Sequence, residues 1–575
     1  MSPPASDVRT GRADALRRNR PGYLLIGPSV VLLLAVFVGG MLTLLEYSFH
    51  RVLSDGTDIS GTLATWRDLV TNAHRWDVLR QTVELGVIVT AVTALVGWPT
   101  AYALHRIRSE ALRYLGLFVV FAPLLTSVIA RTYGWELILG DDGVLNALLG
   151  AVGLGGVKVL YTQTSVVVAL VHILLPFMVF PLTSSLRQLD PALVDAAGDL
   201  GAGPFTRFRR VVLPLTLPGL IAGMQLVFAL TISSFATPAL LGGGRVQVMA
   251  TTVYDDVNNV DWPMAAAVSY SLLAVAVVAL ALFGMLQRRV RRGNGGGVTA
   301  AASTHSAGLL WSTWLGVIYV FVLAPLVVIV VNSFSSVSYG AWPPPAWSTK
   351  WYANLFAQEG LGSAVVLSLE VAVAATVLAT VLGTAAALAF VRYRPAGARV
   401  LESFALSPTV VPKVAFGFAG FVFLHRISLF GGVLGLVLTH VVVTLPFVLI
   451  VMTAALVRTD ATLDEAAADL GARPLRAFLA ATLPQVRSAV VASALFAFIV
   501  SFDEVDMTVF LLSPQQNTLP VWMFTYMQKY QDPTLAALSS ILIAVAVLLA
   551  AVVAVLFARS GALSALAGDR QRQEG

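Results

Sequence analysis

Residues 195–214 read DAAGDLGAGPFTRFRRVVLP, and residues 465–484 read EAAADLGARPLRAFLAATLP. Both stretches belong to a longer match without gaps between residues 176–222 and 446–492. Four upstream residues also recur: Glu84, Gly97, Ala101 and Arg106 correspond to Glu370, Gly383, Ala387 and Arg392. The segment between the two blocks is 16 residues longer in the first copy. Self-similarity over this length indicates two copies of one structural unit.

Long apolar runs flank both stretches. The chain has 575 residues, 57% of them hydrophobic and 12% charged, which is typical of a polytopic membrane protein. Residues 23–45 contain no charged side chain and no small-residue cleavage site, so they are expected to form a retained first helix. The predicted fold class is all-α integral membrane with twelve transmembrane helices, at 23–45, 83–104, 114–132, 164–186, 213–236, 265–287, 310–333, 364–391, 400–424, 431–457, 486–512 and 534–558.

Basic residues predict the orientation of these spans. Most of the 37 Lys and Arg residues fall in alternate connecting segments, which the positive-inside rule assigns to the cytoplasm. Both termini are then cytoplasmic, and the two six-helix copies lie parallel about a pseudo-twofold axis. The net charge of +6 follows from this topology, so no nucleic-acid partner is expected.

The predicted organisation follows from the spans and the repeat. A glycine-rich tether separates the two copies. The predicted segments are a cytoplasmic segment at 1–22, a first membrane unit at 23–287 with its core at about 79–287, a cytoplasmic linker at 288–308, a second membrane unit at 309–558 with its core at about 362–558, and a cytoplasmic tail at 559–575.

Composition argues against several chemistries. The chain has no cysteine, and its seven histidines show no metal-ligand spacing, so no metal site and no cofactor is expected. The connecting segments are short, which leaves no room for a soluble catalytic domain. The chain is therefore predicted not to be an enzyme, and no catalytic residue is assigned.

The repeated stretch is predicted to form two short helices at an angle. Asp190 before Pro191, and Asp460 in the second copy, are expected to cap the first helix. Gly201 and Gly471 lie eleven residues after these caps, where glycine can adopt the left-handed conformation that ends a helix. Each stretch is thus expected to be a hinged loop on the cytoplasmic face.

This pattern resembles the "EAA" loop of the inner-membrane permeases of binding-protein-dependent ABC importers. In that family the short helix docks on an ATPase subunit. The resemblance implies eight coupling residues: Asp195, Ala196, Ala197, Gly201, Glu465, Ala466, Ala467 and Gly471. The first copy departs from the motif by having Asp in place of Glu. The alternative is that each stretch is an ordinary amphipathic connector. The occurrence of the motif at matching positions in both copies argues against this alternative.

The resemblance also implies partners. The chain has no Gly-x-x-x-x-Gly-Lys-Ser/Thr phosphate loop, so a separate ATPase dimer would hydrolyse ATP on the cytoplasmic face. An extracytoplasmic solute-binding protein would deliver the solute, and the lipid bilayer of a bacterial plasma membrane would surround the helices. The two permease units would then move solute inward by alternating access.

Other segments are similar to permeases of the spermidine/putrescine type. In the first copy these are residues 123–135 and 234–243, and in the second they are residues 501–504 and 519–524. A polyamine such as spermidine or putrescine is therefore the favoured solute. Related systems for aminophosphonates, opines or ferric iron share much of this pattern and remain alternatives.

Charged residues within predicted spans are candidates for the translocation pathway. Asp503, Glu504 and Asp506 fall in the span at 486–512, where they could hold a polyamine by charge. They could instead lie at a broken helix end and pair with Arg131 or with backbone amides. Lys413 would repel a polyamine unless one of these acids neutralises it, which keeps an organic anion or zwitterion open.

Two interpretations also remain open for Glu84 and Glu370. They occupy equivalent places near the outer ends of two predicted helices. They could be helix-start acids favoured by the helix dipole or groups of an outer vestibule.

A secondary transporter driven by an ion gradient is the rival from another class. It too can have parallel six-helix halves. The segment after the second span reads His105-Arg106-Ile107-Arg108-Ser109-Glu110, without the Gly-x-x-x-Asp-Arg-x-Gly-Arg signature of such transporters. A membrane enzyme would need clustered His, Cys or paired carboxylates on a common loop, and the sequence shows no such cluster.

Overall fold

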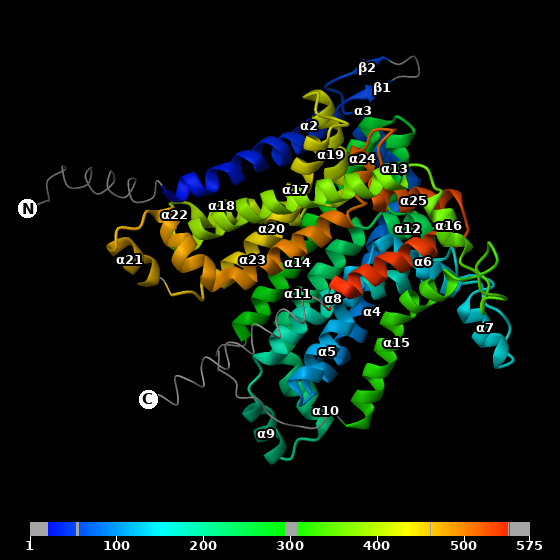
Figure 1. Cartoon of the computed structure of the whole chain (residues 1–575), viewed down its shortest axis with the longest axis horizontal. Helices are drawn as coiled ribbons and strands as arrows, with labels where there is room; N and C mark the ends of the chain where they lie inside the picture. Colours follow the sequence, from blue (N-terminus) through cyan, green and yellow to red (C-terminus); the bar gives the residue numbers. More distant parts are fainter. Residues whose placement is uncertain (1–20, 53–56, 294–307, 461, 550, 552–575) are drawn as a thin grey trace, which may run out of the picture.

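The structure is a computed structural model that describes residues 21–52, 57–293, 308–460, 462–549 and 551. It is built almost entirely of helices (Figure 1). Within the described residues, nine helices are long and apolar enough to cross a membrane, and two further bent pairs raise the number to eleven. The all-α membrane fold is confirmed. The count of twelve stays a prediction, because the last expected span, 534–558, is described as the helix Thr534–Leu549 and lies partly outside the described residues.

The first copy begins with a helix from Pro21 to Ser48 that contains the π-helical turn η1 (Leu33–Val38) and α2 (Gly39–Ser48). Its other elements are β1 (Arg51–Val52), β2 (Asp58–Ile59), α3 (Ala64–Thr71), α4 (Ala73–His105), α5 (Glu110–Phe121), η2 (Ala122–Leu125), α6 (Val128–Leu139), α7 (Val144–Ala151), α8 (Gln163–Arg187), α9 (Pro191–Asp199), α10 (Pro204–Arg207), η3 (Phe208–Val212), α11 (Leu213–Ser233), α12 (Ala236–Leu241), α13 (Met249–Asn258) and α14 (Trp262–Gly293). The antiparallel strands β1 and β2 pair Arg51 with Ile59.

The second copy repeats this order. Its elements are α15 (Leu309–Asn332), α16 (Lys350–Phe356), α17 (Leu361–Leu388), η4 (Ala389–Tyr393), α18 (Ala398–Leu406), η5 (Ser407–Thr409), α19 (Lys413–Arg426), α20 (Val433–Leu456), α21 (Thr462–Asp469), α22 (Pro474–Ala477), η6 (Phe478–Thr482), α23 (Leu483–Phe502), α24 (Thr508–Leu511) and α25 (Leu519–Lys529). We call the end of the bundle with α9 and α21 the elbow end, and the end with α13 and α25 the rim end.

The spans expected at 114–132 and 400–424 are bent rather than continuous helices. Each is a pair of helices bent by 97°, α5 with α6 and α18 with α19. In the first copy the chain becomes extended at Thr126, and the Ser127 side chain caps α6 by accepting from the Ile129 backbone N–H. In the second copy Val411 precedes Pro412, and a residue before proline avoids the helical conformation. Both breaks therefore have a local cause in the sequence.

The long helices of each copy pack closely at a repeated glycine. A Cβ atom on Gly97 in α4 would lie 2.6 Å from Cγ of Met178 in α8. A Cβ atom on Gly383 in α17 would lie 2.7 Å from Cγ1 of Val448 in α20. The absence of a side chain thus brings the first long helix of each core against the third in the same way, which explains why this glycine occurs in both copies.

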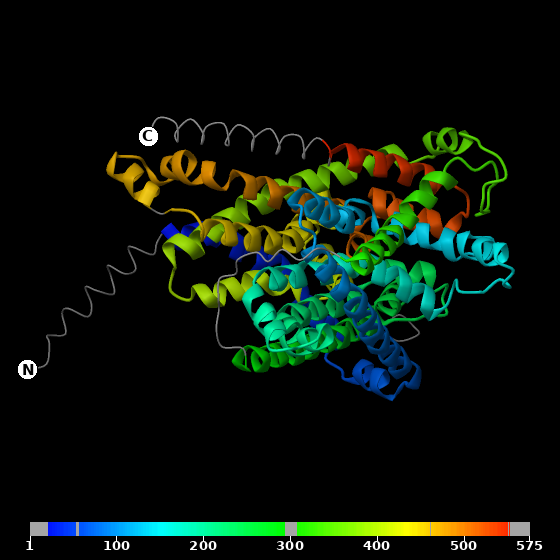
Figure 2. The same cartoon turned by 90° about the horizontal axis from the view of Figure 1, so that it is seen from below.

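The first helix of each copy packs on the other copy. In Figures 1 and 2 the blue N-terminal helix lies beside the yellow and yellow-green helices of the second copy. The Ser29 hydroxyl donates to the Leu382 carbonyl oxygen over 3.2 Å. In the opposite direction, the Trp314 indole of α15 donates to the Thr100 hydroxyl of α4 over 3.1 Å. The two copies are therefore interlocked through exchanged helices.

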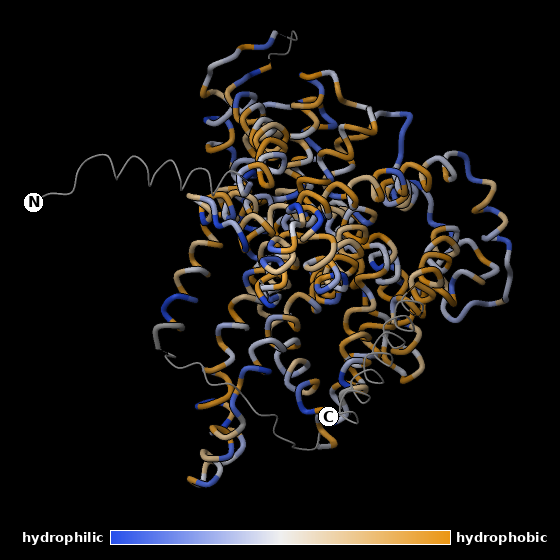
Figure 3. Tube along the Cα trace, turned by 60° about the vertical axis from the view of Figure 1, so that its left-hand side comes forward, coloured by the Kyte–Doolittle hydropathy of each residue, from blue (hydrophilic) through white to orange (hydrophobic). Residues whose placement is uncertain are grey.

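Hydrophobic residues make up much of the long helices, and hydrophilic residues gather largely in the connecting segments (Figure 3). Leu95 on α4 is 75% exposed and Val320 on α15 is 70% exposed. Exposed aliphatic residues on long helices are expected where lipid surrounds the protein.

Candidate functional site

The two repeated stretches form matching elbows at one end of the bundle. The first elbow comprises α9, Gly201 and α10, and the second comprises α21, Gly471 and α22. The Asp190 carboxylate caps α9 by accepting from the Ala192 backbone N–H over 2.9 Å. The Asp460 carboxylate accepts from the Thr462 backbone N–H over 2.9 Å, and this bond holds the pKa of Asp460 below its ordinary value. The predicted caps are present in both copies.

A glycine in the left-handed conformation ends each first helix. Gly201 has φ of +81° and Gly471 has φ of +84°. In the first elbow the Gly201 N–H donates to Gly198 and the Ala202 N–H donates to Ala197, which is the Schellman pattern. The second elbow repeats both bonds, at 2.8 and 3.0 Å. The predicted hinge is therefore present in both elbows, and the same two hydrogen bonds form it in each.

The eight residues expected to couple to an ATPase lie on these elbows. Asp195 and Ala196 are exposed and Ala197 is half-buried on α9, and Glu465, Ala466 and Ala467 show the same pattern on α21. The residue before each glycine is more exposed still: Leu200 is 89% exposed and Leu470 is 90% exposed. Each elbow thus presents an apolar side chain next to an acid-bearing helix.

The elbows differ in how they are held to the bundle. In the second copy the guanidinium Nε of Arg392, in η4 directly after α17, lies 3.4 Å from the Asp464 carboxylate of α21. Asp464 also accepts from the Thr482 hydroxyl, and Arg392 donates to the Thr459 hydroxyl over 2.8 Å. In the register of the repeat, the first copy has apolar residues at the positions of Thr459, Asp464 and Thr482, namely Leu189, Val194 and Val212. A polar tie thus holds the second elbow, and the three positions that form it with Arg392 are apolar in the first.

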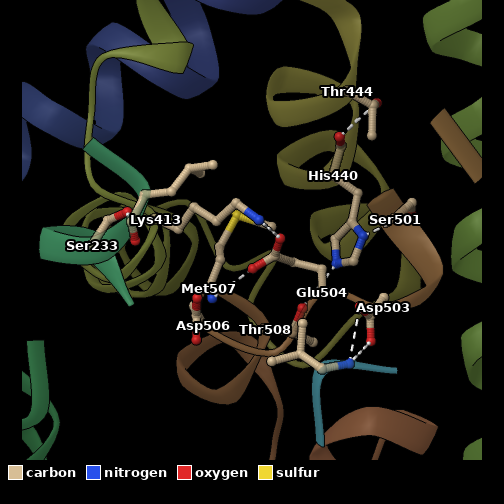
Figure 4. A network of polar contacts seen from close by, with 12 residues as sticks. Ser233, Lys413, His440, Thr444, Ser501, Asp503, Glu504, Asp506, Met507 and Thr508 are labelled. Atoms are coloured by element: carbon tan, nitrogen blue, oxygen red, sulfur yellow. Dashed lines mark hydrogen bonds and ion pairs between the residues drawn. The ribbon is translucent and has the colours of Figure 1, made fainter. Parts of the chain in front are cut away.

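A polar cluster joins the two copies toward the rim end (Figure 4). It contains all five residues named as pathway candidates. The helix expected at 486–512 is wrong in its second part, because α23 ends at Phe502 and helix resumes only at Thr508. The three acids therefore lie in a break. Its non-helical backbone lets the carboxylates reach both N–H groups and cations, as a continuous helix could not.

Asp503 reaches across to the first copy. Its carboxylate accepts from the Val128 backbone N–H at the start of α6 over 3.0 Å. The Arg131 guanidinium lies 3.6 Å from the same carboxylate and is 2% exposed. An acid at the positive end of a helix dipole, next to a buried cation, is well compensated. The pairing with Arg131 and backbone amides is thus the arrangement present.

Glu504 and Lys413 form an ion pair within the second copy. Nζ of Lys413, the first residue of α19, lies 2.6 Å from Oε2 of Glu504. The other carboxylate oxygen accepts from the Met507 backbone N–H over 3.1 Å. Asp506 in turn accepts from the Ala236 backbone N–H of the first copy over 3.2 Å. Across the cluster, three carboxylates face two cationic side chains.

The acids occur in one copy only. In the register of the repeat, the first copy has Ser233, Ser234 and Ala236 at their positions. The cluster is therefore asymmetric about the pseudo-twofold axis.

Sequence reasoning missed a buried histidine beside the acids. His440 of α20 is 2% exposed, and its ring nitrogens lie 2.8 Å from the Ser501 hydroxyl and 3.1 Å from the Thr508 hydroxyl. It thereby links α20 to the end of α23 and the start of α24. The available signal was a histidine inside an uncharged run of 24 residues, where a polar ring needs partners.

Glu84 and Glu370 are not helix-start acids. Glu84 lies well inside α4, which begins at Ala73, and Glu370 lies well inside α17, which begins at Leu361. Both are exposed. Of the two interpretations, the helix-dipole one is wrong because both residues lie more than two turns from a helix start.

Aromatic rings close the rim end between the copies. The ring centroids of Phe235 and Phe524 lie 5.2 Å apart, and Tyr254 lies 6.0 Å from Phe510. Phe235 and Phe524 are fully buried. The contact between the copies at this end is thus tightly packed.

The chain matches one protein family in two places. Residues 85–292 and 379–561 each match the family described as "Binding-protein-dependent transport system inner membrane component". Together these matches cover more than half of the chain.

Curated relatives agree with this match. The spermidine/putrescine transport system permease protein PotB of Haemophilus influenzae is 37% identical over 209 residues, which cover 36% of this chain and 72% of the relative. PotB of Escherichia coli is 34% identical, over 38% of this chain and 80% of the relative. The putrescine transport system permease protein PotI of Escherichia coli is 33% identical, over 39% and 82%. A bacterial alginate ABC transporter in complex with its periplasmic protein aligns with a TM-score of 0.40 and 18% identity, over 49% of this chain and 98% of its own chain.

The repeated elbows, the two membrane cores and the two family matches coincide along the sequence. The chain therefore belongs to the family of inner-membrane components of binding-protein-dependent transport systems, and it carries two permease units in one polypeptide.

Proposed function

We propose that this chain forms both halves of the translocation pathway of an ATP-driven polyamine importer. An ATPase dimer would bind the two elbows on the cytoplasmic side, and an extracytoplasmic binding protein would deliver solute at the rim end. Both termini would then be cytoplasmic, in agreement with the distribution of basic residues.

The elbows carry this proposal. Two separate segments of the chain end a short helix with the same left-handed glycine and expose a leucine at the same position. A large apolar side chain that is about nine-tenths exposed on a short hinged helix suits a docking surface for a second protein. The repetition suits a partner that is itself a dimer.

The polar cluster favours a cationic solute. The sequence argument against a polyamine was the positive charge of Lys413. Since Glu504 engages that ammonium group at 2.6 Å, its charge is compensated within the protein. The third carboxylate of the cluster leaves an excess of negative charge, which an ammonium group of spermidine or putrescine can balance. The relatives whose names include these amines support the same choice.

Reconstitution tests the proposal. The chain is placed in proteoliposomes with the ATPase and binding protein encoded beside it, and uptake of labelled spermidine and putrescine is measured with and without ATP. Uptake is expected to require ATP. Unlabelled 2-aminoethylphosphonate, octopine and ferric citrate are expected not to compete. Competition by one of these would replace the polyamine with that solute.

Variants of the elbow glycines test the docking step. Gly201→Val with Gly471→Val is expected to reduce co-purification of the ATPase at least tenfold, because φ near +80° is strongly strained for a β-branched residue and the elbow must change shape to relieve it. Gly61→Val is the matched control: Gly61 has φ of +73° and lies in the segment after β2. ATP-independent uptake by the chain alone would instead identify an ion-gradient transporter.

A further inference from the structure

Outside the elbows and the cluster, the first copy has a pocket of about 780 Å³ at the rim end. It lies between the start of α4, the segment before α8 and the segment after α12. Its lining is mostly polar and includes Asp77, Arg80, Glu84, Gln163 and Arg245. Two carboxylates and two guanidinium groups therefore surround one hollow.

A second hollow adjoins the first. It has a volume of about 450 Å³ and shares Arg80 and Glu84 with the polar pocket, but its other lining residues are Trp76, Leu79 and Val83. A charged pocket beside an apolar one suits an amphiphilic ligand.

The position along α4 corresponds to the surface of a bilayer. Glu84 lies 21 residues before His105, the last residue of α4, and at a rise of about 1.5 Å per residue this spans ~31 Å, the thickness of a hydrocarbon core. On the same helix face, Val87 is 55% exposed and Leu95 is 75% exposed. The pocket thus lies directly beyond a lipid-facing stripe, at headgroup level.

The second copy lacks this polar lining. In the register of the repeat, Val366 and Leu367 of α17 replace Arg80 and Gln81, and Val433 of α20 replaces Gln163. Val366 is 53% exposed, as expected for a lipid-facing position. Glu84 recurs as Glu370, but the arginine and the two glutamines that line the pocket with it occur in the first copy only, and the shared fold does not explain this difference.

The walls of the pocket are fixed by other contacts. Arg75 and Asp256 form a two-bond ion pair at 2.8 Å that ties the start of α4 to α13. Tyr161 packs on Gly243, where a Cβ atom would lie 2.4 Å from the ring. The pocket is therefore preformed.

We propose that this pocket binds the headgroup of a zwitterionic aminophospholipid in the rim-side leaflet. The phosphate would lie between the guanidinium groups of Arg80 and Arg245, as basic pockets bind lipid phosphates. The ethanolamine ammonium would donate to the carboxylates of Asp77 and Glu84. The acyl chains would leave along the hollow beside Trp76, an aromatic residue typical of the membrane interface.

Native mass spectrometry of the purified full chain tests the assignment. The protein is exchanged into detergent with equal amounts of phosphatidylethanolamine, phosphatidylglycerol and phosphatidylcholine. Phosphatidylethanolamine is expected to be retained at least fivefold more than either other lipid. The double variant Asp77→Asn with Glu84→Gln is expected to abolish this preference, and Arg80→Gln with Arg245→Gln to lower retention of all three.

Glu370→Gln is the matched control, because Glu370 occupies the position of Glu84 on the copy without the pocket. It is expected to retain lipid as the unaltered chain does, and a single symmetric gel-filtration peak shows that each variant is folded. Equal retention of the three lipids, or unchanged selectivity in the Asp77 and Glu84 variant, overturns the proposal. The proposal is also overturned if no lipid is retained and the binding protein alone occupies the pocket, because the ligand of the pocket would then be a polypeptide.

Discussion

Glu504 is 4% exposed, and a carboxylate so deeply buried requires compensation. The Lys413 ammonium at 2.6 Å and the Met507 N–H supply it. The pair spans the start of α19 and the break after α23. The charges therefore hold together two points at which helices are interrupted.

Removing one member of this pair is expected to cost more than removing both. Lys413→Met leaves a buried carboxylate without its cation, which costs about 3 kcal/mol in the free energy of unfolding. Adding Glu504→Gln to Lys413→Met is expected to restore most of that loss, because an amide still accepts from Met507. Thermal unfolding of the purified chain in detergent measures both.

The exposed ion pair between Arg426 and Glu46 provides the comparison. Both side chains are more than half exposed, so Arg426→Met is expected to change the free energy of unfolding by less than about 1 kcal/mol. If the Lys413 variant were as stable as the Arg426 variant, the pair would not compensate a buried charge.

At the scale of residues, the sequence identified which groups meet but not how. Arg131, Lys413 and the three acids could be named because charge is rare in apolar runs. Their pairing joins residues more than 90 positions apart, and in the case of Arg131 and Asp503 it crosses between copies. No local pattern contains that information, so the alternatives for Asp503 could only be separated by the fold.

At the scale of elements, prediction succeeded where cap and hinge residues occur at a fixed spacing in both copies. The elbow caps and hinges follow from Asp, Pro and Gly at fixed spacing, and the structure has them in both copies. The helix breaks at Thr126 and Pro412 were missed, because hydropathy continues across them while the backbone turns by 97°. Hydropathy reports burial in lipid and is insensitive to backbone direction.

The polar tie of the second elbow is expected to couple ATP hydrolysis to transport. Asp464→Asn removes the ion pair with Arg392 and loosens α21 from the end of α17 and the start of α23. Solute moved per ATP hydrolysed is expected to fall several-fold, while ATPase co-purification persists because the exposed face of α21 is unchanged. Uptake and phosphate release in the same proteoliposomes give the ratio.

A charge swap separates this tie from a general loss of folding. Arg392→Asp with Asp464→Arg is expected to recover part of the ratio that either single change loses. Arg399→Gln, on the exposed part of α18, removes the same charge nearby and is expected to leave the ratio unchanged. If the swap recovers nothing while both proteins remain folded, the tie does not position the elbow.

At the scale of the whole molecule, the cores of the two copies meet at the rim end. Phe235, Tyr254, Phe510 and Phe524 close the rim end, and Asp503 and Asp506 cross there to the first copy. At the other end, α9 and α21 lie at separate corners of the molecule (Figure 1). In the proposed importer, this arrangement is the one expected before ATP draws two ATPase subunits together.

The exchanged first helices restrict how the copies can move. Since Ser29 is bonded to the second copy and Trp314 to the first, the copies cannot separate without breaking both contacts. Rotation about the interlocked helices, which brings the elbows together as the rim opens, preserves them. The expected motion is therefore a rocking of two rigid halves.

The natural lack of cysteine allows that motion to be measured directly. Spin labels on Leu200→Cys and Leu470→Cys report the distance between the elbows, and both positions are about nine-tenths exposed. With the ATPase bound, a non-hydrolysable ATP analogue is expected to shorten this distance by more than 10 Å, because ATP closes the ATPase dimer beneath the elbows. Labels on Leu200→Cys and Leu112→Cys, both in the first copy, are expected to keep their distance. An elbow distance that stays constant while ATP is bound and solute is transported would show that the halves do not rock, and that the elbows do not transmit the motion of the ATPase.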